Sequence, residues 1–411
     1  MSVEYMKRGC RVLDGGLACE IERKGFDVNS DPLWTARLLH TNPDVIRDIH
    51  LSHLNAGASI IITASYQASV AGFCEHLQVS TSEAMGLIER SVSLARQARD
   101  DFIRDKFLND MPPPLIAGSV GPYGACQHDR SEYTGSYVDH MTEQEFMDWH
   151  RPRVASLLGC GVDLLAIETQ PALKEALAIV KLLREYPSAR AWVTFSCKDS
   201  LHTCRNDLFS TAVEQISLSP QIVAIGVNCT HPSYVTPLLE SAKGCTSLPF
   251  VVYPNSGNDF SDGKSLCGES FIPHLSSWVQ LGARLIGGCC GVGVREIELI
   301  GNEWRALRQG LAMCCTSGPV ITSELTLLYD QLAHTTLQPA SSHHSMTSEI
   351  TPLYDQLAHT TLRPASSHYS TTTMTSKLTL LRLVEANRDC DGLGFMKSQK
   401  VPHKLTPLYD Q

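Results

Sequence analysis

Between about residues 8 and 310, short apolar runs alternate with longer amphipathic stretches. Eight of the apolar runs have the length of β-strands and consist mainly of β-branched and other apolar residues. This pattern is typical of strands that are buried on both faces of a parallel sheet. The predicted strands are Arg11–Leu13, Ser59–Thr63, Leu115–Gly118, Val162–Ile167, Ala191–Phe195, Ile222–Val227, Pro249–Val252 and Arg284–Ile286.

The stretches between these runs have the pattern of helices. Asn42–His50 begins with a capping residue type at Asn42 and a proline at the first helical position. A second helix is expected from Ser82 to Arg90. The repeated alternation of strand and helix predicts an α/β fold, a (β/α)8 TIM barrel, over residues 1–315. A doubly wound sheet fits the same alternation and is the alternative.

The last quarter of the chain is repetitive. The segment Thr322–His343 recurs almost unchanged at Thr347–His368, and fragments of it follow. Two near-identical copies are too few to stack into the core of a solenoid. The Ser-, Thr-, His- and Pro-rich composition predicts that residues 316–411 form a low-complexity, disordered tail that takes no part in the chemistry. The alternative is that its Leu-Tyr-Asp-Gln-Leu pieces form transient helices or a docking motif.

The composition of the 411 residues, 43% hydrophobic and 19% charged, is that of a globular chain with a large core. No apolar signal segment begins the chain and no run of about 18 apolar residues occurs, which predicts a cytoplasmic protein without a membrane segment. In that compartment the 15 cysteines are expected to be reduced. The net charge of -9 favours small-molecule substrates over nucleic acid. Nothing in the sequence predicts the oligomeric state.

Carboxylates and thiols follow directly on several of the predicted strands. Asp14–Gly16 follows the first strand, Glu168 the fourth, Cys229 comes shortly after the sixth, and Cys289–Cys290 after the eighth. Barrel enzymes build their sites from the carboxyl ends of the strands. These residues are therefore expected to meet at one end of the barrel.

Cys229, Cys289 and Cys290 supply the number of protein ligands typical of a catalytic zinc, which keeps a fourth position open. Adjacent cysteines share a metal only where the backbone leaves strand geometry, which Gly287–Gly288 and Gly291 permit. The alternative is that all three are small buried apolar residues. The other cysteines are interpreted as core or surface thiols: Cys10, Cys19, Cys74, Cys126, Cys160, Cys197, Cys204, Cys245, Cys267, Cys314 and Cys315.

Seven motifs follow one another over about the first 305 residues: Leu13–Gly25, Asp31–Arg37, Thr63–Ser69, Gly118–Ala125, Ser131–Gly135, Gly226–Cys229 and Gly287–Cys290. Together and in this order, they resemble the homocysteine S-methyltransferases. The resemblance implies a zinc-dependent barrel that transfers a methyl group to homocysteine and so forms methionine.

In that family the sulfur of homocysteine takes the fourth zinc position, and the resemblance places the three zinc ligands on Cys229, Cys289 and Cys290. Zinc coordination deprotonates a thiol, and the thiolate is the nucleophile. By position, Asp14 and Glu168 match carboxylates associated with the amino acid substrate. A carboxylate before two glycines also fits a simple loop or helix cap. Gly15–Gly16 would let the backbone approach the ligand closely.

The sequence leaves the methyl donor open. Leu13–Ala18 and Asp31–Trp34 look like the branch that uses a sulfonium, S-methylmethionine or S-adenosylmethionine, and betaine is the alternative donor. Aromatic residues near the predicted rim either line a cation site or simply pack: Trp34, Tyr66, Tyr123 and Tyr253. The backbone amides of Ser119–Gly121 or Gly291 are alternative sites for the substrate carboxylate.

Two segments depart from the family pattern. The stretch after Asp199 follows it only loosely, which puts the loop after the fifth strand in doubt, and the repetitive tail is foreign to it. A non-catalytic zinc or thiol redox sensor on the same barrel is therefore kept as a second function. The presence of Asp14 and Glu168 favours the enzyme, because a sensor needs no amino acid pocket.

Overall fold

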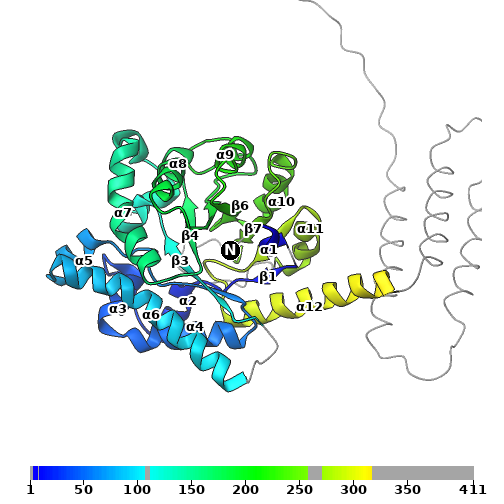
Figure 1. Cartoon of the computed structure of the whole chain (residues 1–411), viewed down its shortest axis with the longest axis horizontal. Helices are drawn as coiled ribbons and strands as arrows, with labels where there is room; N and C mark the ends of the chain where they lie inside the picture. Colours follow the sequence, from blue (N-terminus) through cyan, green and yellow to red (C-terminus); the bar gives the residue numbers. More distant parts are fainter. Residues whose placement is uncertain (1–2, 8, 107–111, 258–270, 317–411) are drawn as a thin grey trace, which may run out of the picture. The chain divides into compact units, whose positions relative to one another are not determined.

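The computed structural model shows eight parallel strands in a ring that is enclosed by helices (Figure 1). It describes residues 3–7, 9–106, 112–257 and 271–316, with side chains of the last helix as far as Arg305. The strands are β1 (Arg11–Val12), β2 (Ile60–Ile62), β3 (Leu115–Val120), β4 (Leu164–Gln170), β5 (Ala191–Phe195), β6 (Ile222–Asn228), β7 (Phe250–Tyr253) and β8 (Ala283–Ile286).

Neighbouring strands are hydrogen-bonded in the order β1-β8-β7-β6-β5-β4-β3-β2. A parallel bridge between Leu13 and Ile60 joins the two ends of this series and completes the barrel. A doubly wound sheet would place the first strand in its middle. The predicted TIM barrel is confirmed, and the alternative fold is wrong.

The helices lie around the ring of strands (Figure 1). They are α1 (Val3–Lys7), α2 (Leu17–Arg23), α3 (Leu38–Thr41), α4 (Pro43–Asn55), α5 (Val70–Leu77), α6 (Thr81–Lys106), α7 (Glu143–Gly159), α8 (Leu173–Leu182), α9 (Phe209–Ile216), α10 (Pro232–Ser241), α11 (Leu275–Gln280) and α12 (Val294–Thr316). Pro43 begins α4 as predicted, and α6 begins one residue before Ser82. The side chain of Asn42 makes no capping hydrogen bond, because this residue forms the tight connection from α3 and its amide bonds to Leu38 O.

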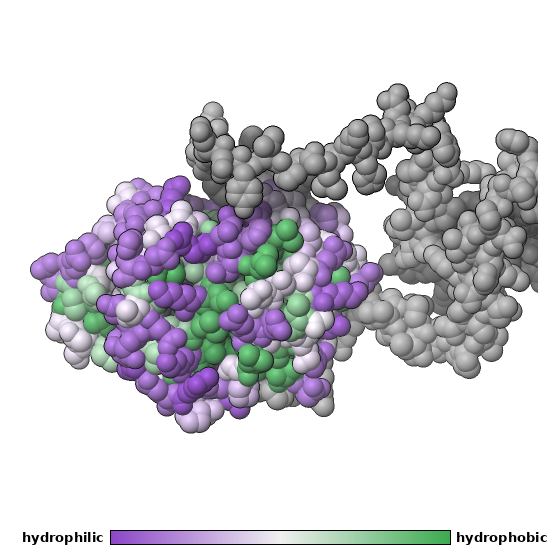
Figure 2. Space-filling model, turned by 90° about the horizontal axis from the view of Figure 1, so that it is seen from above, coloured by the Kyte–Doolittle hydropathy of each residue, from purple (hydrophilic) through white to green (hydrophobic). Residues whose placement is uncertain are grey.

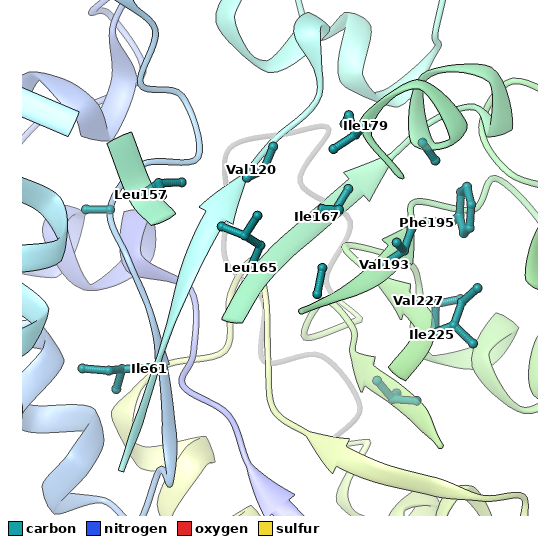
Figure 3. Close-up of a cluster of buried hydrophobic side chains, with 14 of the residues drawn as sticks. Ile61, Val120, Leu157, Leu165, Ile167, Ile179, Val193, Phe195, Ile225 and Val227 are labelled. Carbon is teal, nitrogen blue, oxygen red and sulfur yellow. The ribbon is translucent and has the colours of Figure 1, made fainter. Parts of the chain in front are cut away.

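Side chains alternate along each strand between the barrel interior and the helices. In β4, Leu165 and Ile167 face outward and pack with Leu157 and Ile179 of α7 and α8 (Figure 3). Leu164 and Ala166 belong to a second cluster inside the barrel, which also includes Met6 of α1, Leu115, Trp192, Val251 and Leu285. Met6 is fully buried, so α1 contributes to the inner core of the barrel. Burial of each such large side chain is worth roughly 1.5–3 kcal/mol.

Three strands extend beyond their predicted ends into polar residues. β3 continues through Ser119, β4 through Glu168 and β6 through Asn228. Glu168 follows Leu164 and Ala166 in alternation, so its side chain points into the barrel from the strand itself. The prediction that Glu168 follows the strand is therefore wrong by a few residues, because polar side chains that bond one another inside the barrel let the strands continue.

Polar residues cover much of the visible face of the molecule in Figure 2, and apolar residues gather toward its middle. Within the part of the chain that the structure describes, no helix has the length and apolarity needed to span a membrane. The predicted boundary at residue 315 falls at the end of α12. The repetitive tail that was predicted to begin at residue 316 lies outside the described residues from residue 317 onward, and this division stays a prediction.

Candidate metal centre and substrate pocket

The structure brings the three predicted cysteines together at the carboxyl ends of β6 and β8, which both pair with β7. The Sγ atom of Cys229 lies 3.0 Å from that of Cys289 and 3.5 Å from that of Cys290. All three Sγ atoms lie within 4.8 Å of one another, with Cys229 buried and the other two half-buried. Their convergence fits a metal site, and their role as metal ligands stays a prediction.

An unusual backbone positions Cys229. This residue has φ +49, in the left-handed region that side chains seldom adopt. Its neighbour Asn228 accepts a hydrogen bond from the amide of Thr169 and donates one to Thr169 Oγ1, each at 2.7 Å. Thr169 also has a positive φ, of 57. The Asn228 side chain therefore links β6 to β4 at the position where both strands end.

The glycines around Cys289 and Cys290 have two different roles. Gly291 has φ +79, as the prediction of a departure from strand geometry requires. Gly287 and Gly288 are needed for space instead. A Cβ on Gly287 would lie 2.6 Å from Leu13 Cβ, and one on Gly288 would lie 1.9 Å from Val292 Cγ1. The conformational freedom predicted for all three glycines is therefore used only at Gly291.

The thiols influence each other's ionisation. Hydrogen bonds from Cys229 and then Cys289 hold the pKa of Cys290 well below its usual range. The cluster thus favours a thiolate among thiols, and thiolates are the form in which cysteine binds metal. A tetrahedral zinc with bonds of about 2.3 Å places its sulfur ligands about 3.8 Å apart. The two distances from Cys229 Sγ, 3.0 and 3.5 Å, are shorter than this by less than about 1 Å, and all three sulfurs lie within 4.8 Å of one another, so the set fits such an ion after a small adjustment.

Two residues beside the centre were not assigned to it from the sequence. The hydroxyl of Tyr133 lies 3.3 Å from Cys229 Sγ, and its motif, Ser131–Gly135, was the available signal. Cys19 was interpreted as a core or surface thiol. Its sulfur accepts a hydrogen bond of 2.9 Å from the amide of Gly291, next to Cys290. That amide is therefore already used and is not free for a substrate carboxylate.

Asp14 and Glu168 are both buried at the same end of the barrel. Asp14 Oδ2 accepts a hydrogen bond of 2.7 Å from the amide of Ile62, and Glu168 accepts from Ser119 Oγ and, at 3.1 Å, from the Tyr253 hydroxyl. Burial raises the pKa of Glu168 to about 7. Burial also raises the pKa of Asp14 well above its usual range, and the charge of Glu168 adds to this effect.

Neither carboxylate is in ion-pair contact with a described Lys, Arg or His side chain, and the more distant charge of Arg153 offsets only part of the rise that burial causes in the pKa of Glu168. Buried carboxylates are normally compensated by a cation or a metal. A substrate that brings a positive group into this pocket would therefore relieve an electrostatic cost that the protein itself leaves in place. An α-ammonium group has the required charge and hydrogen-bond donors.

Gly15 and Gly16 connect the carboxylate side of the pocket to the thiols. A Cβ on Gly15 would lie 2.5 Å from Val292 O, and one on Gly16 would lie 2.5 Å from Cys289 O. The amide of Gly16 donates to Val292 O, and Asp14 O accepts from the amide of Gly288. In the direction of these missing side chains, the cysteine-bearing loop packs backbone against backbone. The contact of Gly15 and Gly16 with a substrate stays a prediction.

Replacement of Gly16 by alanine is expected to displace the loop that carries Cys289 and to weaken metal binding. Even a partial shift of a ligand should lower metal affinity by about 10- to 100-fold, the loss typical of a disturbed outer shell. Metal titration of the apo protein measures the effect. Gly86→Ala is the matched control, because a Cβ at Gly86 in α6 meets no atom within 4 Å. Equal metal affinity of the two variants would contradict the role given to Gly16.

The rim aromatics do not act as one group. Tyr123 packs against Tyr137 and Trp149, with ring centroids 5.2 and 5.1 Å away, and Tyr253 bonds Glu168 inside the barrel. Packing is thus the better interpretation of Tyr123. The ring of Trp34 lies 5.0 Å from that of His128. The loop after β5 forms a short hairpin, with bridges from Cys197 to Thr203 and from His202 to Leu208.

An eight-stranded parallel barrel with thiols and carboxylates at the carboxyl ends of its strands defines a TIM-barrel enzyme. A sequence model of the homocysteine S-methyltransferase family matches residues 11–303. Homocysteine S-methyltransferase YbgG of Bacillus subtilis is 43% identical over 304 residues, which are 72% of this chain and 95% of that protein. The betaine-homocysteine S-methyltransferase of Drosophila melanogaster is 40% identical over 302 residues, 70% of this chain and 91% of that protein.

Among solved structures, the metallated form of the homocysteine methyltransferase MmuM from Escherichia coli matches with a TM-score of 0.65 and 40% sequence identity. The match covers 73% of this chain and 98% of that one. The chain belongs to the homocysteine S-methyltransferase family, and it is an enzyme that transfers a methyl group to homocysteine.

Proposed function

We propose that this enzyme is zinc-dependent and transfers a methyl group from a sulfonium donor, S-methylmethionine or S-adenosylmethionine, to the thiolate of homocysteine, forming methionine in the cytoplasm. The observation that carries the proposal is the convergence of three thiols and two buried carboxylates without an ion-pair contact at one end of the barrel. The thiols suit a metal, and the carboxylates suit the ammonium group of an amino acid.

Cys229, Cys289 and Cys290 would hold the zinc, and the three-thiol set leaves one position for a substrate. When bound, zinc supplies the charge that deprotonates the homocysteine thiol at neutral pH. Three protein thiolates donate enough electron density for the substrate sulfur to stay nucleophilic. The half-buried positions of Cys289 and Cys290 leave the centre accessible to a small molecule.

Asp14 and Glu168 orient homocysteine through its ammonium group. Ser119 and Tyr253 donate to Glu168 and so fix the direction of the carboxylate that the ammonium meets. The link from Asp14 through Gly16 to Cys289 sets the separation between the ammonium site and the thiol centre. Holding the substrate at both ends aligns its sulfur for attack on the donor methyl carbon. The new bond forms between the homocysteine sulfur and this carbon, while the bond from the carbon to the donor sulfur breaks and its electron pair stays on the donor sulfur, which becomes a neutral thioether.

The donor is tested with purified, zinc-replete protein that receives homocysteine and S-methylmethionine, S-adenosylmethionine or betaine in separate reactions. Methionine is expected from a sulfonium donor. Methionine from betaine alone would replace the proposed donor class and keep the acceptor. A protein that binds zinc and forms no methionine with any donor would contradict the proposed function and favour the redox sensor.

A further inference from the structure

Arg153 of α7 is almost completely buried and makes its contacts to the backbone of the barrel rim. It is 3% exposed, and His150 of α7 and Glu175 of α8 beside it are 0% exposed. None of the three contacts the thiol centre or the carboxylate pair directly, and the charge of Arg153 offsets part of the rise that burial causes in the pKa of Glu168. A buried guanidinium and carboxylate are costly to keep unless good geometry compensates them, and apolar residues of similar volume often stabilise a fold as well. Stability alone therefore gives a weak reason for these residues.

Arg153 donates hydrogen bonds to carbonyl groups of two separate segments. Its Nη1 donates to the carbonyls of Ser65, Tyr66 and Ala68, at 3.4, 2.9 and 3.3 Å, and its Nη2 donates to Gly121 O. The first segment follows β2 and the second follows β3. One side chain thus holds the exits of two neighbouring strands in register.

His150 connects Arg153 to Glu175. Arg153 Nη2 lies 3.1 Å from His150 Nδ1, and His150 Nε2 lies 2.9 Å from Glu175 Oε1. A guanidinium only donates, so Nδ1 must accept, and the proton of a neutral imidazole must then be on Nε2, facing Glu175. Burial lowers the pKa of His150, which agrees with the neutral ring. The contacts define one arrangement of protons.

Glu175 completes the network with bonds to the segment after β3 and to Tyr137, in a third part of the rim. Its Oε1 also accepts from the amide of Tyr123 at 2.6 Å, and its Oε2 accepts from the Tyr137 hydroxyl. Tyr123 lies two residues after Gly121, which Arg153 holds. The segment after β3 is therefore anchored twice by groups on α7 and α8.

The two anchored segments meet at Tyr66 and Gly121. A Cβ on Gly121 would lie 2.5 Å from Tyr66 O and 2.7 Å from Tyr66 Cδ2, so the tyrosine ring lies directly against the glycine backbone. The hydroxyl of Tyr66 is buried near Thr169 and makes no hydrogen bond of normal geometry to a described residue. Burial, and then the charges of Glu132, Cys229 and Glu168, raise the pKa of Tyr66. Its neighbour Ser65 bonds Ser119, and Ser119 bonds Glu168, so the segment that carries Tyr66 lies beside the carboxylate pocket.

A second connection leads from the same segments to Glu168. Ser65 Oγ donates to Ser119 O at 2.8 Å, and Thr63 Oγ1 accepts from the amide of Ser119 at 2.9 Å. Ser119 in turn donates its hydroxyl to Glu168. Displacement of the segment after β2 would therefore move both the Tyr66 phenol and the donor that orients Glu168.

We propose that Arg153, His150 and Glu175 are positioning residues for methyl transfer, which hold the segments after β2 and β3 so that Tyr66 presents its unpartnered hydroxyl to the bound substrates and Ser119 orients Glu168. The proposal rests on the proposed function for its kinetic consequence. Its structural part, the tethering of the two segments, is measurable without turnover.

The test uses the full-length, zinc-replete protein and the variants Arg153→Met, Glu175→Gln, Tyr66→Phe and the double variant Arg153→Met/Tyr66→Phe. Gln221→Leu is the matched control. Gln221 is also buried and donates to three backbone carbonyls, those of Leu183, Tyr186 and Ala189, but it precedes β6 at the opposite end of the barrel. Bound zinc, the unfolding midpoint, kcat and KM for each substrate, and amide hydrogen exchange are measured for every protein.

Arg153→Met is expected to lower kcat/KM by about 100-fold, the effect of a misplacement of about 1 Å in a site, while the protein keeps its zinc. Glu175→Gln, which is milder for the fold, should lower it in the same direction. In the protein that already carries Tyr66→Phe, Arg153→Met should lower kcat/KM by about tenfold less than it does alone. The effects of residues that act through one another are not additive. Gln221→Leu should lower the unfolding midpoint and leave kcat/KM unchanged.

The proposal would be overturned if the loss in kcat/KM of the double variant equalled the product of the losses of Arg153→Met and Tyr66→Phe. It would also be overturned if the activity of every variant, the control included, simply followed its unfolding midpoint. Hydrogen exchange separates it from the proposed function. If the unsubstituted protein forms no methionine, the function fails, but faster exchange of residues 64–68 and 119–124 in Arg153→Met than in Gln221→Leu still supports the tethering. Equal exchange in these segments would overturn it.

Discussion

The Cys289→Ala protein is expected to lose its bound zinc and its methyl transfer activity together. Removal of one of three thiolates leaves two protein ligands, fewer than a catalytic zinc site uses. The loss in metal affinity should exceed the 10- to 100-fold that a disturbed outer shell costs. Metal analysis of the purified protein, with methionine formation measured on the same sample, gives both quantities.

Cys245→Ala provides the control for this change. Cys245 is also half-buried and unpaired, and its sulfur lies 4.0 Å from Ser241 O, before β7 and away from the three-thiol cluster. The control should keep about one zinc per chain and full activity. A Cys289→Ala protein that kept both zinc and methionine formation would show that Cys289 is not a ligand.

Glu168→Gln is expected to raise the KM for homocysteine, because the amide keeps the shape of the carboxylate and removes its charge. A hydrogen bond to a charged group contributes about 1.5–3 kcal/mol, so the loss in kcat/KM for homocysteine should be roughly 10- to 100-fold. The KM for the methyl donor at saturating homocysteine and the zinc content should not change. Steady-state kinetics with each substrate varied in turn separates these effects.

The same residue predicts a pH dependence. The pKa of Glu168 is raised to about 7, so below that pH the carboxyl group is protonated and must lose its proton before it binds an ammonium group. The KM for homocysteine should therefore rise as the pH falls through about 7 in the unsubstituted enzyme. The part of this rise that Glu168 causes should be absent in Glu168→Gln, where Asp14 is the remaining carboxyl group. An unchanged KM and an unchanged pH profile would contradict the ammonium site.

The fold was predictable because a parallel barrel buries both faces of its strands, which then appear in the sequence as uninterrupted apolar runs. The ends of β3, β4 and β6 were not predictable, because polar residues interrupt the apolar pattern there: Ser119, Glu168 and Asn228. Their hydrogen bonds run between strands that are far apart in the sequence. Such partners are absent from any local pattern, so the strands were predicted too short.

The candidate site was likewise predictable only in part. The convergence of Cys229 with Cys289 follows from strand order in a barrel, and the structure bears it out. The place of Cys19 beside Gly291 does not follow from the sequence, because Cys19 is in α2 and has no motif that distinguishes it from the other thiols. Arg153 was missed for a related reason. A charged residue inside an amphipathic helix suggests a solvated position, and only its four carbonyl partners show otherwise.

The loop after β5 was doubtful because its sequence departs from the family pattern after Asp199. In the structure, the carboxylate of Asp199 accepts hydrogen bonds from the amides of Leu201 and His202, both at 2.8 Å, and so forms the turn of the hairpin. A turn of this kind needs an acceptor at its first position and tolerates variety elsewhere. The local departure therefore leaves the barrel and the three-thiol cluster intact.

The central claim is that homocysteine is activated at a zinc held by three cysteines, and X-ray absorption at the zinc edge tests it most directly. The zinc-loaded protein is measured alone and with homocysteine. Three sulfur neighbours at about 2.3 Å are expected without substrate and four with it. An unchanged set of neighbours on addition of saturating homocysteine, in a protein that forms methionine, would contradict the central claim.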